Sequence, residues 1–453
     1  MKKETSSKRG RGVLDSYGET IVETLVSFGV PTEIVEKREG IHQYEYRLKL
    51  LKPTRMKALR SFEDDLRYAL GTQNVHIIAP IPDHVLVGVI IEKKETPEPI
   101  SWSTFLSTLP TQKFGPLEFP IGLGEYGEPV TLNLATSGGV LIGGTTGSGK
   151  SMFLHLIVQS LLHRFSPDMC RLMLVDTKRI EFSDYEGIPH LFAPVIHEAK
   201  KALIALKWCT REMERRFDIL AAANVMHIAE YHTKFGTKKN HESLPYIVFI
   251  IDEVADLIHS YPEEFESTFV RLFQMCRAVG IHIIISTQRP SVNVITGLVK
   301  ANIPTRIALS VASQYDSRTI LDTVGAEKLR GKGDALVQTT DSPKSKRVQL
   351  FSIKESEIRK KSKELRELDG VERDMVNLYP HTSRTDYDED NGDYDDLYEI
   401  AEEAVREAGK ASTSFLQRRL RVGYSRAARL IDMLEEKGVI SPGEGSGPRM
   451  VMK

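Results

Sequence analysis

Short apolar runs alternate with longer helical stretches between about residues 100 and 352. Runs that are apolar throughout are typical of strands buried on both faces, and helical spacers of this length allow parallel crossovers. The pattern therefore predicts an α/β domain, a sheet covered by helices, over residues 101–375. Its predicted strands are Gly139–Ile142, Arg171–Val175, Tyr246–Ile251, His282–Ser286, Arg306–Val311 and Asp334–Gln338.

Residues 13–100 show a mixed pattern that predicts a small α+β domain. Five basic residues within 1–12 form a short tail before it, and prolines 97 and 99 mark a linker after it. The elements expected are a helix at Ser16–Phe28, strands around Tyr44–Lys49 and Val75–Ala79 with a helix between them, and a strand at Val85–Ile91.

The C-terminal part of the chain separates into an acidic and a basic segment. Ten acidic residues and no Lys or Arg lie within 386–403, so we expect residues 376–394 to be a flexible acidic linker. Residues 395–453 then predict three helices followed by a glycine-rich hairpin at Gly443–Gly447, the pattern of a winged helix. A three-helix cap that binds protein is the alternative. The predicted helices lie at about 395–408, Ser412–Leu420 and Ser425–Lys437.

Composition excludes several classes of protein. The 453 residues carry a net charge of −1, and apolar stretches such as Val248–Ile251 are far shorter than the ~18 residues of a membrane span. The three cysteines form no CxxC pair, which excludes a cysteine zinc site and fits a reducing compartment. We therefore expect a cytoplasmic chain of several domains without a membrane segment.

A phosphate-binding loop lies between the first predicted strand of the α/β domain and an apolar helix. Glycines at such a loop let several backbone N–H groups point inward, and the helix N-terminus adds its positive dipole end. Lys150 is expected to reach the β and γ phosphates of ATP and Ser151 to hold Mg²⁺. The loop residues are Gly144, Thr145, Thr146, Gly147, Ser148, Gly149, Lys150 and Ser151.

Polar residues also follow two later strands. Asp252 and Glu253 end the run Tyr246–Ile251, at the sheet edge where open α/β sheets bind ligands. We expect Asp252 to be the second Mg²⁺ partner and Glu253 to be the base that polarises the attacking water. Gln288, after the next strand, is placed to sense the γ-phosphate. Together these residues predict a nucleoside triphosphatase core.

Seven long strings along the chain carry a resemblance to a known family: GTTGSGKS at 144–151, DYEGIPHL at 184–191, EMERRF at 212–217, IDEVADL at 251–257, STQRPSVNVITGLVKANIPTRIA at 286–308, DSRTILD at 316–322 and GAEKLRGKGD at 325–334. They resemble the FtsK/SpoIIIE family of DNA translocases. The resemblance runs from about residue 16 to the end and implies a small α domain, a RecA-like P-loop motor and a C-terminal γ domain. It further implies a hexameric ring around duplex DNA.

The resemblance also implies roles for single residues. Arg306 matches the arginine that reaches the neighbouring subunit's nucleotide, an arginine finger. Arg318, Lys328, Arg330 and Lys344 match a region that supplies loops contacting the DNA backbone. Asn293 and Thr177 stand where the family usually has Asp and Pro, and neither departure touches the phosphate chemistry.

The C-terminal helices carry a second set of expected DNA contacts. Arg426 and Arg429 lie one turn apart near the start of the third helix, where a winged helix reads DNA. Ser425 stands where the family usually has Asn, so the preferred DNA sequence is expected to differ. Arg418, Arg419 and Arg421 are expected to contact phosphates, which position the domain without reading bases.

These observations predict an ATP-driven, ring-shaped pump for double-stranded DNA that acts in the segregation or transfer of chromosomal or mobile-element DNA. The winged helix would give sequence-directed loading, and a recombinase or a division protein is a further implied partner. Two alternatives stay open. One is an ATPase of the same superfamily that exports protein, and the other is a DNA-binding regulator that ATP switches.

Overall fold

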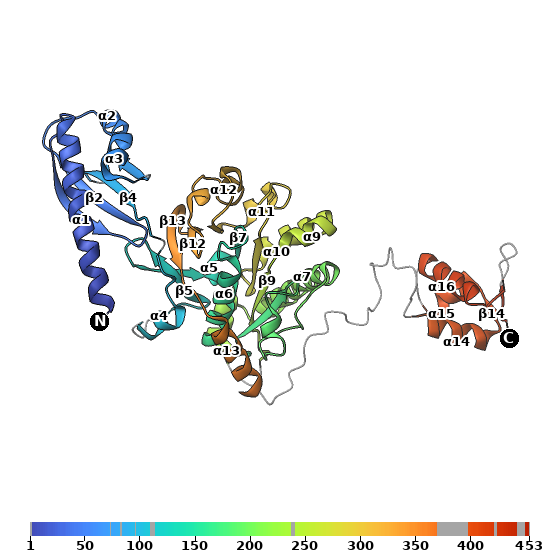
Figure 1. Cartoon of the computed structure of the whole chain (residues 1–453). Coiled ribbons are helices and arrows are strands. Elements are labelled where there is room, and N and C mark those ends of the chain that lie inside the picture. Colours follow the sequence, from blue (N-terminus) through green and yellow to red (C-terminus); the bar gives the residue numbers. More distant parts are fainter. Residues whose placement is uncertain are drawn as a thin grey trace. The chain divides into compact units, whose positions relative to one another are not determined.

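The computed structural model describes residues 2–72, 74–81, 84–95, 97–108, 114–236, 241–368, 397–420, 424–441 and 449–452. The chain divides into two compact units, residues 1–378 and 379–453. In Figure 1 the colours follow the sequence from the N-terminus (blue) to the C-terminus (red). The predicted acidic linker, 376–394, lies outside the described residues.

The first unit begins with a small domain of one four-stranded antiparallel sheet and three helices. Helix α1 (Lys2–Ser27) includes nearly all of the segment expected as a basic tail. The strand order is β1-β2-β4-β3, and buried apolar side chains such as Tyr46, Leu66 and Val89 fill the core under the helices. The other elements are β1 (Thr32–Glu39), β2 (Gln43–Leu50), α2 (Met56–Ser61), α3 (Glu63–Leu70), β3 (Val75–Ile78) and β4 (Val87–Glu92).

A nine-stranded sheet forms the rest of this unit, in the order β6-β5-β13-β12-β11-β7-β10-β9-β8. The five strands from β11 to β8 are parallel, and their almost continuous burial explains why they are apolar throughout. The strands are β5 (Glu118–Gly124), β6 (Pro129–Asn133), β7 (Gly139–Gly143), β8 (Cys170–Val175), β9 (Tyr246–Ile251), β10 (Ile281–Thr287), β11 (Thr305–Leu309), β12 (Asp334–Thr339) and β13 (Ser342–Leu350).

All six strands predicted for this domain are present, with ends that differ by at most two residues. The sheet nevertheless differs from a purely parallel one, because β12 runs antiparallel to β11 and is followed by the antiparallel strand β13. Strands β5, β6 and β13 were not predicted. The first half of β13 is polar and partly exposed, so it lacks the apolar run that marked the buried strands.

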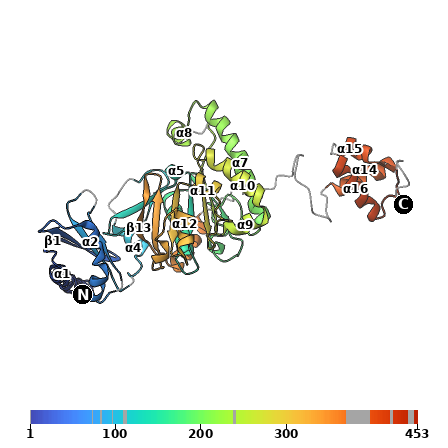
Figure 2. The same ribbon diagram turned by 90° about the horizontal axis from the view of Figure 1, so that it is seen from above.

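Helices connect and cover the strands of the sheet (Figures 1 and 2). Helix α6 (Lys150–Arg164) is buried along most of its length, which explains why most of its central residues are apolar. The remaining helices of the unit are α4 (Trp102–Thr108), α5 (Leu134–Ser137), α7 (Ala199–Ala222), α8 (Ile228–Phe235), α9 (Val254–Ser260), α10 (Pro262–Met275), α11 (Gly297–Asn302), α12 (Gln314–Leu321) and α13 (Glu355–Leu368), with 3₁₀ turns η1 (Ser183–Tyr185) and η2 (Ala326–Lys328).

The second unit is a three-helix domain with a small antiparallel ribbon. Its buried core includes Val405, Leu416 and Leu430, one from each helix. The predicted hairpin, Gly443–Gly447, lies outside the described residues, but the strands that flank it pair with the rest of the domain. The elements are α14 (Tyr398–Ala408), β14 (Lys410–Ala411), α15 (Thr413–Leu420), α16 (Tyr424–Glu436) and β15 (Arg449–Met450). Three helices and a pairing ribbon are the expected architecture of a winged helix.

Within the parts of the chain that the structure describes, no helix combines the length and the apolar character that crossing a membrane requires.

Candidate nucleotide site

The strand order brings the predicted phosphate and acidic residues to one edge of the sheet. Strand β10 lies between β7, which leads into the phosphate loop, and β9, which Asp252 follows directly. Parallel pairing aligns the carboxyl ends of these strands, with Thr287 opposite Gly143 and Ile285 opposite Ile251. Residues that are about 100 and 140 positions from the phosphate loop therefore lie beside it.

The phosphate loop, Gly144–Ser151, is held from behind by two backbone segments. The N–H and hydroxyl of Thr145 both donate to the carbonyl of Ser310, each at 3.0 Å. On the other side the N–H of Gly333 donates to the carbonyl of Ser148 at 3.0 Å. Gly149 has φ +109°, and a Cβ at this position would lie 2.8 Å from the nitrogen of Gly333. A side chain is therefore excluded by conformation and by space.

Lys150, the first residue of α6, is buried and points across the site. Its Nζ donates to the Asp252 carboxylate at 2.5 Å and to the Asp252 carbonyl at 2.8 Å. The Ser286 hydroxyl accepts a third bond at 3.2 Å. Burial raises the pKa of Asp252, and the ammonium of Lys150 opposes that rise. The structure thus brings together the two groups that the motifs assigned to phosphate and metal.

The carboxylate of Glu253 is fixed by groups on β10 and on the loop after β8. Thr287 donates its hydroxyl at 2.6 Å, and the backbone N–H of Gln288 donates at 3.1 Å. Nζ of Lys178 lies 3.5 Å away and forms an ion pair. Gln288 in turn accepts a bond from the Thr146 hydroxyl at 3.0 Å, which connects the residue expected as γ-phosphate sensor to the phosphate loop.

Carboxylate oxygens lie near the position expected for Mg²⁺, one in contact with Ser151 and one on the strand end that shapes the same loop. The Ser151 hydroxyl donates to Glu181 at 2.6 Å. Asp176, at the end of β8, is fully buried, and one of its carboxylate oxygens has no hydrogen-bond partner. Mg²⁺ prefers hydroxyl, carboxylate and phosphate oxygens and usually keeps several waters, so a closed set of protein ligands is not required. The oxygen donors around Ser151 and Asp252 therefore fit this ion.

Sequence reasoning missed Asp176, Lys178 and Glu181. Asp176 follows an apolar strand in the same way that Asp252 does, so the pattern that identified Asp252 could also have identified it. Its carboxylate accepts the N–H groups of Glu181 and Phe182, at 2.9 and 3.0 Å, and so shapes the loop that presents Glu181. Lys178 and Glu181 lie in that irregular loop, where no periodic pattern marks them.

Arg306 lies on β11, and its guanidinium is bound within its own subunit. It donates to the carbonyls of Ile303 and Lys300 at 3.0 and 2.8 Å, and Nη1 lies 2.5 Å from Oδ2 of Asp322. Its side chain is 15% exposed. Burial alone would raise the pKa of Asp322, but hydrogen bonds from Lys300 and Arg306 bring it below its ordinary value. Its role toward a neighbouring subunit stays a prediction.

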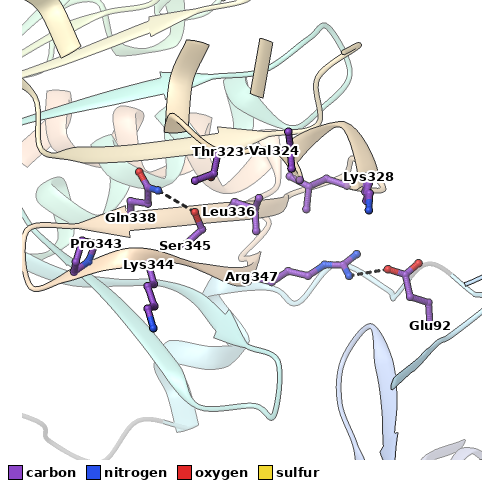
Figure 3. A pocket seen from close by; sticks show the side chains of 12 residues that line it. Glu92, Thr323, Val324, Lys328, Leu336, Gln338, Pro343, Lys344, Ser345 and Arg347 are labelled. Carbon is purple, nitrogen blue, oxygen red and sulfur yellow. Dashed lines mark hydrogen bonds and ion pairs between the residues drawn. The ribbon is translucent and has the colours of Figure 1, made fainter. Parts of the chain in front are cut away.

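The residues expected to contact DNA from the motor lie in two different settings. Arg318 on α12 is exposed, and exposed Lys328 and Lys344 line a groove of about 490 Å³ between η2 and the β12–β13 hairpin (Figure 3). Arg330, by contrast, donates to the carbonyls of Glu95, at 2.9 Å, and Lys93. Arg330 thus attaches the motor to the segment that follows the small domain, so its side chain is committed elsewhere in this structure.

The expected DNA contacts of the C-terminal unit are only partly described. Ser425, Arg426 and Arg429 lie within helix α16, and Arg418 and Arg419 within α15. Arg419 is exposed. The side chains of Arg418, Ser425, Arg426 and Arg429, and all of Arg421, lie outside the described residues.

In chain order the five parallel strands are arranged 5-1-4-3-2, with the phosphate loop after the first and the acidic pair after the third. This fold and this site define a RecA-like P-loop nucleotide-binding protein. Family models match in three segments. They are the FtsK alpha domain at residues 1–92, the FtsK/SpoIIIE family at 110–292 and the FtsK gamma domain at 392–453. The chain belongs to the FtsK/SpoIIIE family.

Curated relatives are similar over almost all of this chain. The DNA translocase FtsK of Clostridium tetani (strain Massachusetts / E88) is 41% identical over 431 residues, covering 95% of this chain and 58% of the relative. The DNA translocase SftA of Bacillus subtilis (strain 168) is 40% identical over 437 residues, covering 95% of this chain and 45% of the relative. The chain therefore spans about half to three fifths of the length of these relatives.

Solved structures share the fold. The conjugation coupling protein TcpA of pCW3, in its monomer form with ATPγS, is 24% identical with a TM-score of 0.55, covering 78% of this chain and 99% of that one. The cytoplasmic domain of the type VII secretion ATPase EccC of Thermomonospora curvata is 23% identical with a TM-score of 0.53, covering 62% of this chain and 36% of that one. Likeness at this level establishes the architecture alone.

Proposed function

We propose that this chain is an ATP-hydrolysing translocase of double-stranded DNA that works as a homo-oligomeric ring, with six subunits as the expected number. The observation that carries the proposal is the convergence of Lys150, Asp252, Glu253 and Gln288 at one sheet edge, in a chain that also has a winged-helix unit. Relatives named DNA translocases support DNA over polypeptide as the substrate.

The side chains around the phosphate loop suggest how hydrolysis proceeds. Lys150 exchanges its bonds to Asp252 for the β and γ phosphates of ATP, and the N–H groups of the loop bind the remaining oxygens. Glu253, already oriented by Thr287 and Gln288, accepts the proton of the attacking water. Mg²⁺, held by Ser151 and Asp252 with the phosphates, would neutralise charge that develops on the transferred group.

The ring supplies the remaining parts. Arg306 of one subunit stabilises the transition state in the next, so hydrolysis requires assembly. Arg318, Lys328 and Lys344 grip the phosphate backbone, which carries no base information, and the C-terminal unit reads sequence. The cytoplasm is the proposed location, and moving chromosomal or mobile-element DNA is the proposed task.

Displacement of a third strand from linear duplex DNA tests translocation directly. With ATP the purified chain should displace the strand, and with a non-hydrolysable analogue it should not. Glu253→Gln is nearly isosteric and should lose turnover by about a hundredfold or more while still binding ATP, because it removes the general base. Lys150→Ala should lose both binding and turnover.

Glu263→Gln is the matched control, since Glu263 is an exposed carboxylate on α10 outside the site. It should behave as the unmodified chain in both assays. DNA-stimulated hydrolysis without strand displacement would refute a translocase and favour the ATP-switched regulator. Hydrolysis that ignores DNA would favour the protein exporter.

A further inference from the structure

Helix α12 contacts three parts of the proposed machinery at once. A capping box fixes its first turn, in which the Ser313 hydroxyl and the Asp316 carboxylate each accept a backbone N–H from the other residue. Near its other end Ile320 packs on Gly143, the residue before the phosphate loop, so closely that a Cβ on Gly143 would lie 2.2 Å from Cδ1 of Ile320. A displacement of α12 therefore reaches the nucleotide site directly.

The residue that ends α12 binds Arg306. Asp322 has φ +61°, a left-handed conformation that Asp and Asn tolerate better than most residues. Its carboxylate is shared, with Oδ2 on Nη1 of Arg306 at 2.5 Å and Oδ1 on Nζ of Lys300 at 2.7 Å. Its backbone N–H donates to the carbonyl of Arg318 at 2.9 Å. One helical turn thus links an exposed arginine on α12 to the group that holds Arg306.

The guanidinium of Arg306 is docked, which means that it is bound to groups of its own subunit and is not available to a neighbouring one. Its Nε, Nη1 and Nη2 groups all donate within the subunit, and the pair with Asp322 offsets its charge. A guanidinium that is to stabilise phosphate charge in another subunit needs its η nitrogens and its charge available. The docked state is therefore an inactive one. Within the residues that the structure describes, the only carboxylate that Arg306 contacts is that of Asp322.

We propose that Asp322 is a positioning residue that restrains Arg306, and that contact of DNA with Arg318 shifts α12 and releases it. The inference rests on the proposed role of Arg306 in the neighbouring subunit. It explains how a channel contact accelerates hydrolysis at a site made by two subunits. Because Arg318 lies on an eight-residue helix with a fixed N-terminus and Asp322 is the C-cap of that helix, DNA need only tilt or rotate it.

The test compares ATP turnover of the full-length chain with and without linear duplex DNA. Asp322→Asn keeps the shape and the left-handed conformation but removes the charge. Basal turnover should rise about fivefold, because losing an ion pair of about 1 kcal/mol increases the population of released Arg306 by that factor. The stimulation of turnover by DNA should fall by the same factor. Affinity for DNA should not change. A merely structural role would lower turnover in both conditions, and that result would overturn the proposal.

Two further variants separate the inference from the function on which it rests. Arg306→Ala combined with Asp322→Asn should lose the raised basal rate, and a rate that stays raised would refute the restraint. Arg306→Ala alone should abolish stimulated turnover. If it does not, both the proposed role of Arg306 and the restraint fail, whereas wild-type behaviour of Asp322→Asn beside an inactive Arg306→Ala refutes the restraint alone.

Controls address the DNA contact and unspecific charge effects. Arg318→Ala should lose stimulation, and adding Asp322→Asn to it should restore fast basal turnover, because release then no longer needs DNA. A double variant that stays slow would contradict the link through α12. Asp218→Asn, at an exposed position on α7, is the matched charge control and should leave both rates unchanged.

Discussion

Single residues in the nucleotide site are held by groups that their own motifs do not contain. Lys150 is bound by Asp252 and Ser286, which end or follow strands β9 and β10. The motifs indicated which residue types would meet, because phosphate loops and acidic strand ends have recognisable local patterns. They could not indicate Glu181 or Lys178, since only the folded loop after β8 brings those residues to the site.

Histidine 42 yields a prediction at this scale. Its ring is buried where the small domain meets the motor, and neither ring nitrogen has a hydrogen-bond partner; the nearest carboxylate oxygen, on Asp334, is 3.6 Å away. Burial lowers the pKa of His42 to about 4, and Asp334 opposes this only in part. The unfolded chain binds a proton near the ordinary pKa of 6.5, so the free energy of unfolding should fall as pH drops from 6.5 toward 4.

One such histidine can change the free energy of unfolding by at most about 1.4 kcal/mol per pH unit. Between pH 7 and pH 5, His42 should therefore lower the free energy of unfolding of the unmodified chain by up to about 2 kcal/mol. The His42→Gln variant should not show this part of the decrease. Urea unfolding followed by tryptophan fluorescence measures this, because both tryptophans, Trp102 and Trp208, lie in the first unit. His76→Gln, at a half-buried position on β3, is the control. Equal pH slopes for the unmodified chain and His42→Gln would contradict the prediction.

At the scale of elements, the sequence predicted what burial determines. Strands β7, β9 and β10 are buried on both faces, so their residues had to be apolar and could be found. Strand β13 has polar residues over its first half, because only its last residues are fully buried. The local sequence of β12 likewise does not indicate that the strand is antiparallel, because its direction is determined by pairing with β11 and β13.

The turn before β12 should matter for nucleotide binding although no motif assigned it a role. Gly333 has φ +87°, and a Cβ there would lie 3.2 Å from Nε2 of Gln349. Its N–H supports the phosphate loop through Ser148. Gly333→Ala should strain the turn, shift that bond and weaken ATP affinity on the order of tenfold, which titration with a fluorescent ATP analogue measures.

Gly127→Ala provides a matched control for this prediction. Gly127 has a similar φ, +88°, but a Cβ there would meet no atom within 4 Å. Both variants should lose about 1 to 2 kcal/mol of stability to the left-handed backbone. Only Gly333→Ala should bind ATP more weakly. If the two variants bind ATP with the same affinity, the contact between this turn and the phosphate loop does not contribute to ATP binding.

At the scale of the whole molecule, the net charge of −1 conceals segments of opposite sign. Ten acidic residues lie within 386–403, whereas 410–453 carries nine basic residues against four acidic ones. The basic segment belongs to the second unit, which has its own buried core and so should fold without the first. The first unit has separate cores and the nucleotide site. The two units can therefore be tested apart.

Replacing Arg418, Arg419 and Arg421 by Gln should change how DNA binding depends on salt. Each phosphate contact releases counterions, so losing three contacts should reduce the slope of log K against log salt by about 2.7. Basal ATP turnover should stay as in the unmodified chain, because the nucleotide site lies wholly in the first unit.

Truncation after residue 378 removes the whole second unit. It should abolish any preference for DNA orientation, while third-strand displacement continues. A truncated chain that no longer displaces the strand would show that the second unit takes part in movement itself, and an unchanged slope in the triple variant would show that these arginines do not contact phosphates.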